Sequence, residues 1–381
     1  MSSLTSCRRT ATALSLAGAL VWWLAGCGGG DEAGGSPAAP ARGSAGTGGT
    51  AVALAETGGA AANAAAAPAA APLPAEPAAV AAPAERRPRA RAWKGLVALA
   101  VSPDGRTLAT AGSDGSIRLV DPGTAALRRS LVGQGKAVVN GLFFTARGEV
   151  LVSAGTDSVA QLWSVSSGAN LATLRGHEHP LRAVAATADG TAIATAGEET
   201  RVLLWDGKGT LQRILRGHAG FVNALAFSAD GRLLASGDAQ AHIRLWETAT
   251  GKPVATLRGH AGEVNALAFS PDGRSIASGS EDGRVLLWDV AAARQVGAMG
   301  DMASPVRSVA FNAAGTAVAA AGENGVVLVW DAARRQVTVR LAGDGTPVNA
   351  VAFSPGNTST LFAGGQSNRL VTIDTATGRT P

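Results

Sequence analysis

The sequence predicts an all-β fold made of seven similar units, each a four-stranded antiparallel sheet. Two landmarks carry this prediction, because both recur with nearly the same period. The first is a turn segment of the "SPDG" type, whose last residues lie 41 to 43 positions apart, at Gly105, Gly148, Gly190, Gly231, Gly273, Gly315 and Asn357. The second is an apolar residue, tryptophan in five copies, at Val120, Trp163, Trp205, Trp246, Trp288, Trp330 and Ile373. Two landmarks that stay in phase over seven copies indicate a repeat architecture.

Each copy carries the signals of four short strands. In the fifth copy, "VNALAFS" (264–270) precedes the turn "SPDG", and "RSIASGS" (274–280) follows it. "RVLLWDV" (284–290) and "RQVGAM" (294–299) come next, after further turn residues. Short apolar runs bounded by Pro-Asp and Asp-Gly turns are typical of β-hairpins. Both faces of these strands are largely apolar, which predicts that each sheet packs between two others.

A period near 42 residues, four strands and a Trp-Asp ending together resemble the WD40 repeat. The resemblance covers roughly residues 90–381. It implies a seven-bladed WD40-type β-propeller of four-stranded antiparallel blades. In that family a histidine before the first strand, a serine or threonine on the second, an aspartate in the next turn and the tryptophan form a hydrogen-bonded tetrad.

By this resemblance, one copy carries the complete tetrad: His260, Ser278, Asp282 and Trp288. In the copy before it, Gln240 stands where the aspartate is expected, and one copy earlier Glu199 stands there. The copy that ends at Trp163 lacks a histidine. We therefore expect the middle blades to be the most strongly locked. The histidines and aspartates of the tetrad are expected to be architectural and not catalytic.

The two ends of the repeat region predict how the ring closes. The last copy stops after its third strand, "RLVTID" (369–374), and lacks a fourth. "PRARAWK" (88–94) precedes the first copy, where other copies have a fourth strand. We predict that this N-terminal strand completes the last blade and removes an exposed sheet edge. The basic run 86–94 has two interpretations, a solvated edge strand or a contact with anionic lipid headgroups.

The first 27 residues have the pattern of a secretory signal. Arg8 and Arg9 give a positive start, and residues 11–24 are apolar but too few to span a bilayer comfortably as a helix. The run ends in Leu-Ala-Gly-Cys (24–27), which resembles a bacterial lipobox. The resemblance implies that the thiol of Cys27 receives a diacylglyceryl group. An uncleaved signal anchor and a non-lipidated secreted form are the alternatives.

The chain is thus predicted to have three parts: a lipoprotein signal peptide (1–26), a tether with lipidated Cys27 (27–85) and the propeller (86–381). Residues 28–85 are almost entirely Ala, Gly and Pro, so they offer too little apolar surface to offset chain entropy, and we expect disorder. Gly28, in place of an aspartate, favours the outer membrane if the organism has two membranes. We expect an exported protein that is lipid-anchored to the cell envelope.

Common catalytic and ligand-binding motifs are absent from the sequence. It contains no P-loop, no GxGxxG and no GxSxG nucleophile elbow. Both cysteines, Cys7 and Cys27, precede the repeats, which excludes a disulfide or thiolate metal site within them. Basic and aromatic residues are not interleaved, and export argues against nucleic acid as a partner. We expect no catalytic residue, no metal and no cofactor.

The family resemblance also implies a protein-binding face. It is formed by the loops before the first strand and between the second and third strands of each blade. The positions expected to contact a partner on this face include Phe221, Asn223, Glu263, Asn265, Glu281, Glu198, Glu323, Arg182 and Arg307. Aromatic residues are enriched at binding hot spots, and an arc of glutamates steers basic partners.

These observations predict a lipid-anchored propeller of the cell envelope that acts as a non-catalytic protein–protein interaction scaffold. Two alternatives remain open. The first is an enzyme or small-ligand binder that uses a polar ring in the central channel, at Asn140, Arg182, Asn223, Asn265, Arg307 and Asn349. The second is an accessory lipoprotein in outer-membrane protein assembly, which rests on analogy of fold.

Overall fold

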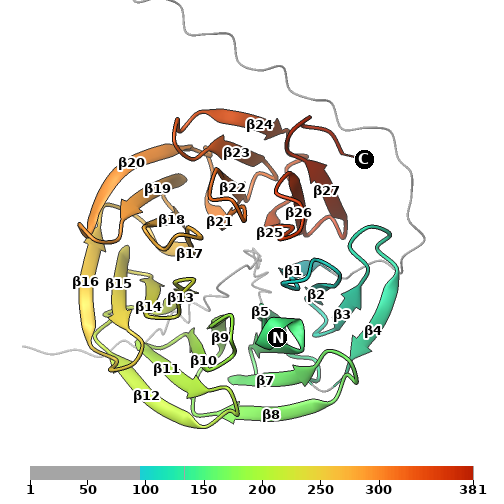
Figure 1. Cartoon of the computed structure of the whole chain (residues 1–381), viewed down its shortest axis with the longest axis vertical. Helices are drawn as coiled ribbons and strands as arrows, with labels where there is room; N and C mark the ends of the chain where they lie inside the picture. The colour runs from blue at the N-terminus through green and yellow to red at the C-terminus, as the bar shows by residue number, and fades with distance from the viewer. Residues whose placement is uncertain (1–94, 133, 381) are drawn as a thin grey trace, which may run out of the picture. The chain divides into compact units, whose positions relative to one another are not determined.

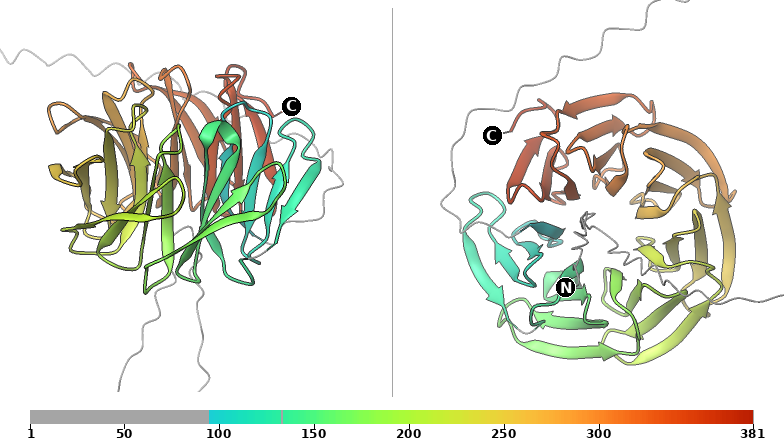
Figure 2. Two further views of the ribbon diagram at one scale, coloured as in Figure 1. Left: turned by 60° about the horizontal axis from the view of Figure 1, so that its bottom comes forward. Right: turned by 180° about the vertical axis from the view of Figure 1, so that it is seen from behind.

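The computed structural model describes residues 95–132 and 134–380. These residues form seven antiparallel sheets arranged as the blades of a ring (Figure 1). Six sheets have four strands, and the seventh has three among the described residues. The predicted seven-bladed all-β propeller is confirmed. The strands run between the two faces of the ring, so the loops gather on those faces (Figure 2).

We number the blades 1 to 7 along the chain. The innermost strands are β1 (Leu96–Val101), β5 (Val139–Thr145), β9 (Leu181–Ala186), β13 (Val222–Phe227), β17 (Val264–Phe269), β21 (Val306–Phe311) and β25 (Val348–Phe353). The second strands are β2 (Leu108–Gly112), β6 (Val150–Gly155), β10 (Ala192–Gly197), β14 (Leu233–Asp238), β18 (Ser275–Ser280), β22 (Ala317–Gly322) and β26 (Thr360–Gly365). One short 3-10 helix, η1 (Ala146–Gly148), joins β5 to β6.

The third strands are β3 (Ile117–Val120), β7 (Val159–Ser164), β11 (Arg201–Asp206), β15 (His242–Glu247), β19 (Arg284–Asp289), β23 (Val327–Asp331) and β27 (Leu370–Asp374). The outer strands are β4 (Leu127–Leu131), β8 (Asn170–Arg175), β12 (Leu211–Arg216), β16 (Pro253–Arg258), β20 (Arg294–Asp301) and β24 (Val337–Leu341). Consecutive strands pair within each blade, so every blade is a simple antiparallel meander.

The core lies between neighbouring blades. Ile243 of blade 4, for example, packs in one cluster with Ile276 and Trp288 of blade 5. Small residues on the second strands let the sheets approach closely. A Cβ atom on Gly237 would lie 2.5 Å from Cγ1 of Val264 in the next blade, so only glycine fits there. Each blade therefore buries its apolar faces only because a neighbour covers them.

The described residues also show where the two ends of the ring meet. Strand β25 of blade 7 contacts β1 of blade 1. The side-chain amide of Asn349 donates to the backbone carbonyl of Leu96 at 2.7 Å, across 253 positions in sequence. The backbone N–H of Gly95, the first described residue, donates to the side chain of Asn368 in the turn before β27. The chain thus enters the ring beside blade 7.

The predicted closing strand, residues 88–94, lies outside the described residues. Within them, the outer edge of β27 adjoins a cavity of about 180 Å³. Its walls include Val327 and Leu341 of blade 6 and Val371 and Ile373 of blade 7. In the other six blades a fourth strand occupies the corresponding outer position. Closure of blade 7 by residues 88–94 therefore stays a prediction.

We predict that deletion of residues 86–94 destabilises the ring. A fourth strand would add about five backbone hydrogen bonds, each worth about 1 kcal/mol net, so its loss lowers the melting temperature by on the order of 10 °C. The measurement is thermal unfolding followed by circular dichroism. Deletion of nine residues from the tether, 60–68, is the control. Equal melting temperatures for the two deletions would refute closure by this segment.

Candidate interaction face

One hydrogen bond, repeated in all seven described blades, unites the two sets of loops on one side of the ring. The residue that follows the second strand donates its backbone N–H to the carbonyl of the residue that precedes the innermost strand. The donor–acceptor pairs, 2.8 to 3.0 Å apart, are Ser113–Gly95, Thr156–Val138, Glu198–Pro180, Ala239–Phe221, Glu281–Glu263, Glu323–Pro305 and Gln366–Pro347. We call the surface formed by these paired loops the loop face.

Beneath the loop face, blade 5 contains a chain of buried hydrogen bonds. The indole N–H of Trp288 donates to Oγ of Ser278 at 2.7 Å. Ser278 lies 2.7 Å from Nε2 of His260, and Nδ1 of His260 lies 3.0 Å from Oδ2 of Asp282. A carboxylate only accepts, so Nδ1 carries the proton, and a neutral ring accepts the serine hydroxyl proton at Nε2. The four predicted residues therefore form one directional chain from Trp288 to Asp282.

Blades 3 and 4 contain equivalent chains, which corrects the expectation that only blade 5 has one. In blade 4 the carboxylate does not come from the turn position of Gln240. It comes from Asp238, two residues earlier, whose Oδ2 lies 2.7 Å from Nδ1 of His218. Oδ1 of Asp238 accepts the backbone N–H groups of Gln240 and His242. One fully buried aspartate thus serves both the tetrad and the turn.

In blade 3 the longer side chain of Glu199 reaches Nδ1 of His177. Nε2 of His177 lies 2.7 Å from Oγ1 of Thr195, and Trp205 donates its indole N–H to the same oxygen at 2.8 Å. Arg201 holds the second carboxylate oxygen of Glu199. Glutamate therefore replaces aspartate here without breaking the chain.

In blade 2 a glutamine takes the place of the histidine, and sequence analysis missed it. Oε1 of Gln134 accepts from the hydroxyl of Ser153 at 2.6 Å, and Nε2 of Gln134 donates to the carbonyl of Val159 at 3.3 Å. Trp163 donates its indole N–H to Ser153 at 2.9 Å. Glutamine thus offers the same acceptor and donor as a neutral histidine. In the other locked blades the histidine lies 18 residues before the serine or threonine, and Gln134 lies 19 residues before Ser153. This spacing could have identified Gln134 from the sequence.

Blade 6 lacks this chain. Met302 and Ala320 are buried near the positions that histidine and serine occupy in blade 5. The indole N–H of Trp330 is buried and has no acceptor among the described residues. Leaving a buried donor unsatisfied costs about 1 to 3 kcal/mol. The locked blades are therefore the adjacent blades 2 to 5.

Burial favours the neutral form of two tetrad histidines, His177 and His260. Burial lowers the pKa of His177 and of His260 below the ordinary 6.5, although Glu199 and Asp282 respectively oppose the shift. Burial acts against ionisation of Asp282 as well. Even so, the backbone N–H groups of Ala261 and Arg284 and the ring of His260 keep the pKa of Asp282 below its usual value. A neutral imidazole and an ionised carboxylate fit the directional chain.

A second network connects the innermost strands around the channel. Arg182 donates to Oδ1 of Asn223 at 3.0 Å, and Asn223 donates to Oε2 of Glu263 at 2.9 Å. In the next blade, Asn265 donates to Oε2 of Glu281 at 3.1 Å and to the carbonyl of Val306 at 3.2 Å. The network therefore joins blades 3, 4, 5 and 6 side by side.

Four of the residues expected to contact a partner are instead mostly buried in this network. The exposed fractions of Arg182, Asn223, Asn265 and Arg307 are 5 to 9%. They hold the glutamates in place. Arg182 pairs with Glu198 at 3.2 Å, and Arg307 pairs with Glu323.

Burial lowers the pKa of both guanidinium groups, and the charge of Glu263 opposes the shift at each of them. Glu263 therefore lies within electrostatic reach of both arginines. The six charged residues of this network (Arg182, Arg307, Glu198, Glu263, Glu281 and Glu323) carry two positive and four negative charges. The net charge of these six residues is therefore –2.

Phe221 is the one large aromatic residue exposed on the described part of the ring, with 42% of its surface accessible. The guanidinium carbon of Arg182 lies 5.6 Å from the centroid of its ring, close enough for a cation–π contact. The loop face therefore combines an aromatic anchor with a fixed group of carboxylates.

Comparison with known proteins agrees with this architecture. The model of the WD domain, G-beta repeat, matches five segments of the chain: 91–121, 168–206, 209–247, 251–289 and 298–331. Together with the seven-bladed ring, these matches identify the chain as a WD40-repeat propeller. Propellers of this class are generally non-catalytic scaffolds that bind proteins.

Three similar proteins share the repeat but little more of their length. An uncharacterized WD repeat-containing protein of Schizosaccharomyces pombe is 33% identical over 98 residues, 26% of this chain and 24% of its own. The nuclear distribution protein PAC1 of Arthroderma otae is 33% identical over 27% of this chain and 24% of its own. The denticleless protein homolog A of Xenopus laevis is 32% identical over 29% and 16%. This chain matches at most about a quarter of these relatives.

In the described part of the chain, no helix is long and apolar enough to cross a membrane. No three His, Cys, Asp or Glu side chains of that part lie close enough together to hold a metal ion.

We predict opposite effects of two substitutions at equivalent positions of blades 5 and 6. Ser278→Ala leaves the indole of Trp288 without an acceptor and should lower the free energy of unfolding by about 2 to 3 kcal/mol. Ala320→Ser supplies the missing acceptor for Trp330 and should raise it by about 1 kcal/mol. Chemical denaturation measures both. Destabilisation by Ala320→Ser would contradict the account of blade 6.

We also predict that acid destabilises the ring through its neutral histidines. The folded-state pKa of His177 and of His260 is depressed, so below pH 6.5 the unfolded chain takes up protons that the folded chain does not. Stability is therefore full above pH 6.5 and falls as the pH drops below it, by about 1.4 kcal/mol per unit of depression.

The double variant His177→Gln and His260→Gln tests this, because Gln134 already performs the same role in blade 2. Its melting temperature should vary less than that of the wild type between pH 7 and pH 5. An unchanged pH dependence would show that other groups are responsible.

Proposed function

We propose that this propeller is an exported, lipid-anchored scaffold of the cell envelope whose loop face binds a protein partner through a basic segment. The observation that carries the proposal is the network of carboxylates on the loop face, which also exposes Phe221; its six charged residues have a net charge of –2. Because buried arginines and asparagines already hold these carboxylates, a partner would not have to order them on binding.

The arrangement of the acids favours a cationic side chain as the central contact. Glu263 and Glu281 each use Oε2 to accept a bond from an asparagine, which fixes the position of both carboxylates. Glu281 is exposed, and Phe221 provides an apolar surface on the same face of the ring. A lysine or arginine has both an apolar stem and a charged head, so it complements these two features.

The membrane part of the proposal rests on residues outside those that the structure describes. The apolar stretch 11–24 and the lipobox-like ending at Cys27 support export and lipidation. Several acyl chains would give stable anchoring, whereas one would hold weakly. Gly28 favours the outer membrane in a cell with two membranes. The tether 28–85 would then connect the lipidated Cys27 to the propeller.

A small ligand of the central channel is a second candidate, and one observation favours it. The side-chain oxygens of Asn140 and Asn349 are buried and have no partner among the described residues. Buried acceptors are normally satisfied, so a donor at these atoms, water or a ligand, fits the geometry.

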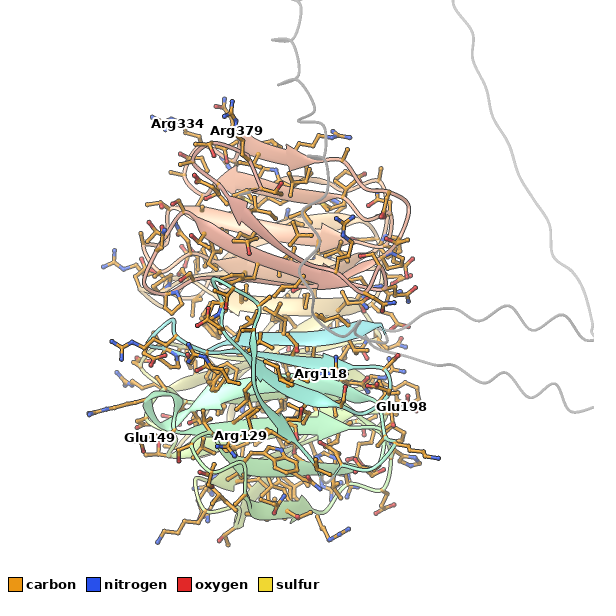
Figure 3. All side chains as sticks on the ribbon, turned by 90° about the vertical axis from the view of Figure 1, so that its right-hand side faces the viewer. Arg118, Arg129, Glu149, Glu198, Arg334 and Arg379 are labelled. Atoms are coloured by element: carbon orange, nitrogen blue, oxygen red, sulfur yellow. The ribbon has the colours of Figure 1, made fainter. Side chains whose placement is uncertain are left out.

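The scaffold proposal is tested by crosslinking in intact cells, purification of the tagged protein and mass spectrometry. The variant Phe221→Ala, Glu263→Gln, Glu281→Gln should lose the partner. Glu149→Gln is the matched control, since Glu149 and Glu198 lie toward opposite faces of the ring (Figure 3). A partner that both variants retain would rule out the loop face as its binding site. A purification without a specific partner would favour a small ligand in the central channel.

The anchor is tested by Cys27→Ser. Without the thiol no diacylglyceryl group can be attached, so the protein should leave the membrane fraction. Fractionation followed by immunoblotting measures this, with Cys7→Ser as the control. Retention of the Cys27→Ser protein in the membrane fraction would contradict lipidation at this residue.

A further inference from the structure

The outer strands of the ring carry a positive net charge, and the remaining described residues carry a negative one. The six outer strands contain eight arginines and one acidic residue, a net charge of +7. The remaining described residues contain 17 basic and 22 acidic residues, a net charge of –5. The propeller is therefore nearly neutral as a whole, yet its outer surface is strongly basic.

The basic surface is most regular on three neighbouring strands, β8, β12 and β16, which we call the outer belt. They follow one another around the ring (Figure 1). Each ends in an exposed arginine, Arg175, Arg216 or Arg258. None of the three strands contains an acidic residue. No carboxylate of the described residues is paired with these three arginines, so their charge is available to a partner.

Exposed aliphatic side chains lie among these arginines. Four of the eight large hydrophobic residues exposed on the described ring belong to the outer belt: Leu171 (55%), Leu211 (41%), Ile214 (39%) and Val254 (57%). Isolated exposed apolar residues need no explanation, but here they share three adjacent strands with a row of arginines. Such a mixture of basic and apolar side chains is characteristic of surfaces that lie at a membrane interface.

The outer side of the ring, where the outer belt lies, is convex (Figure 1). A convex surface suits a deformable partner better than a rigid one. Arginine side chains match phosphate groups in geometry and charge, and aliphatic side chains between them match the acyl boundary below the headgroups.

We propose that the outer belt is a binding surface for an anionic lipid bilayer, on which the propeller lies on its side. Each arginine close to an anionic surface contributes an attraction that salt screens. None of the belt residues belongs to the loop face, so the ring can touch the bilayer and bind a protein partner at the same time. The proposal does not depend on lipidation of Cys27.

The test is cosedimentation of the full chain with vesicles, in the Cys27→Ser background so that no acyl chain contributes. Vesicles of phosphatidylcholine with phosphatidylglycerol are compared with phosphatidylcholine alone. We expect binding to the anionic vesicles to be stronger and to weaken with salt. The variant Arg175→Gln, Arg216→Gln, Arg258→Gln should lower the partition coefficient by roughly 10- to 100-fold.

The matched control is Arg294→Gln, Arg334→Gln, Arg340→Gln, which removes the same charge from blades 5 and 6. Arg294 lies on β20, which has no exposed large hydrophobic residue. Both variants should keep the wild-type melting temperature. An equal loss of binding in the two variants would show a general effect of net charge and would overturn the proposal that the outer belt binds the bilayer. Equal binding of the wild type to neutral and anionic vesicles would overturn the same proposal. Acidic proteins would then be the partners to examine.

Discussion

Mutual burial of neighbouring sheets is the constraint on which the rest of this structure depends. The second and third strands of each blade are apolar on both faces, and only the adjacent blades cover them. Alanines and glycines such as Gly237 set the distance between sheets, because a larger side chain would collide with the next blade. The ring is therefore a single packed object and not a row of independent units. A fixed loop face and a fixed outer surface follow from this packing.

In blades 2 to 5, buried polar side chains form directional chains of hydrogen bonds. In blade 5, Trp288 donates to Ser278, Ser278 to His260, and His260 to Asp282. Gln134 maintains the same order of donors and acceptors in blade 2 without a titratable group. Around the channel, buried arginines and asparagines orient carboxylates toward the surface. Both networks use neutral or paired groups, since an unpaired charge would be costly at such depth.

The sequence predicted the repetition, the strands and the seven blades, because the period of the turns and tryptophans reports directly on backbone geometry. It did not predict the exact source of each buried hydrogen bond. Asp238 acts in place of a residue at position 240, and Gln134 acts in place of a histidine. In both cases a side chain at a different position of the repeat is long enough, and close enough, to form the same hydrogen bond. Burial of Arg182 and Arg307 was also missed, because spacing places a residue on a face but does not show its depth. The closing strand and the N-terminal signal lie outside the described residues and stay predictions.

The bond between Asn349 and Leu96 has a consequence for the order of events in folding. It joins residues 253 positions apart, so it forms only when nearly the whole chain is present. Contacts between such distant residues make folding slow, because the entropy of a very large loop is lost before any contact is gained. A chain that emerges from its N-terminus onward must leave one side of blade 1 uncovered until blade 7 arrives. The final fold is thus delayed until the last blade has been synthesised, and until then blade 1 keeps one apolar side exposed.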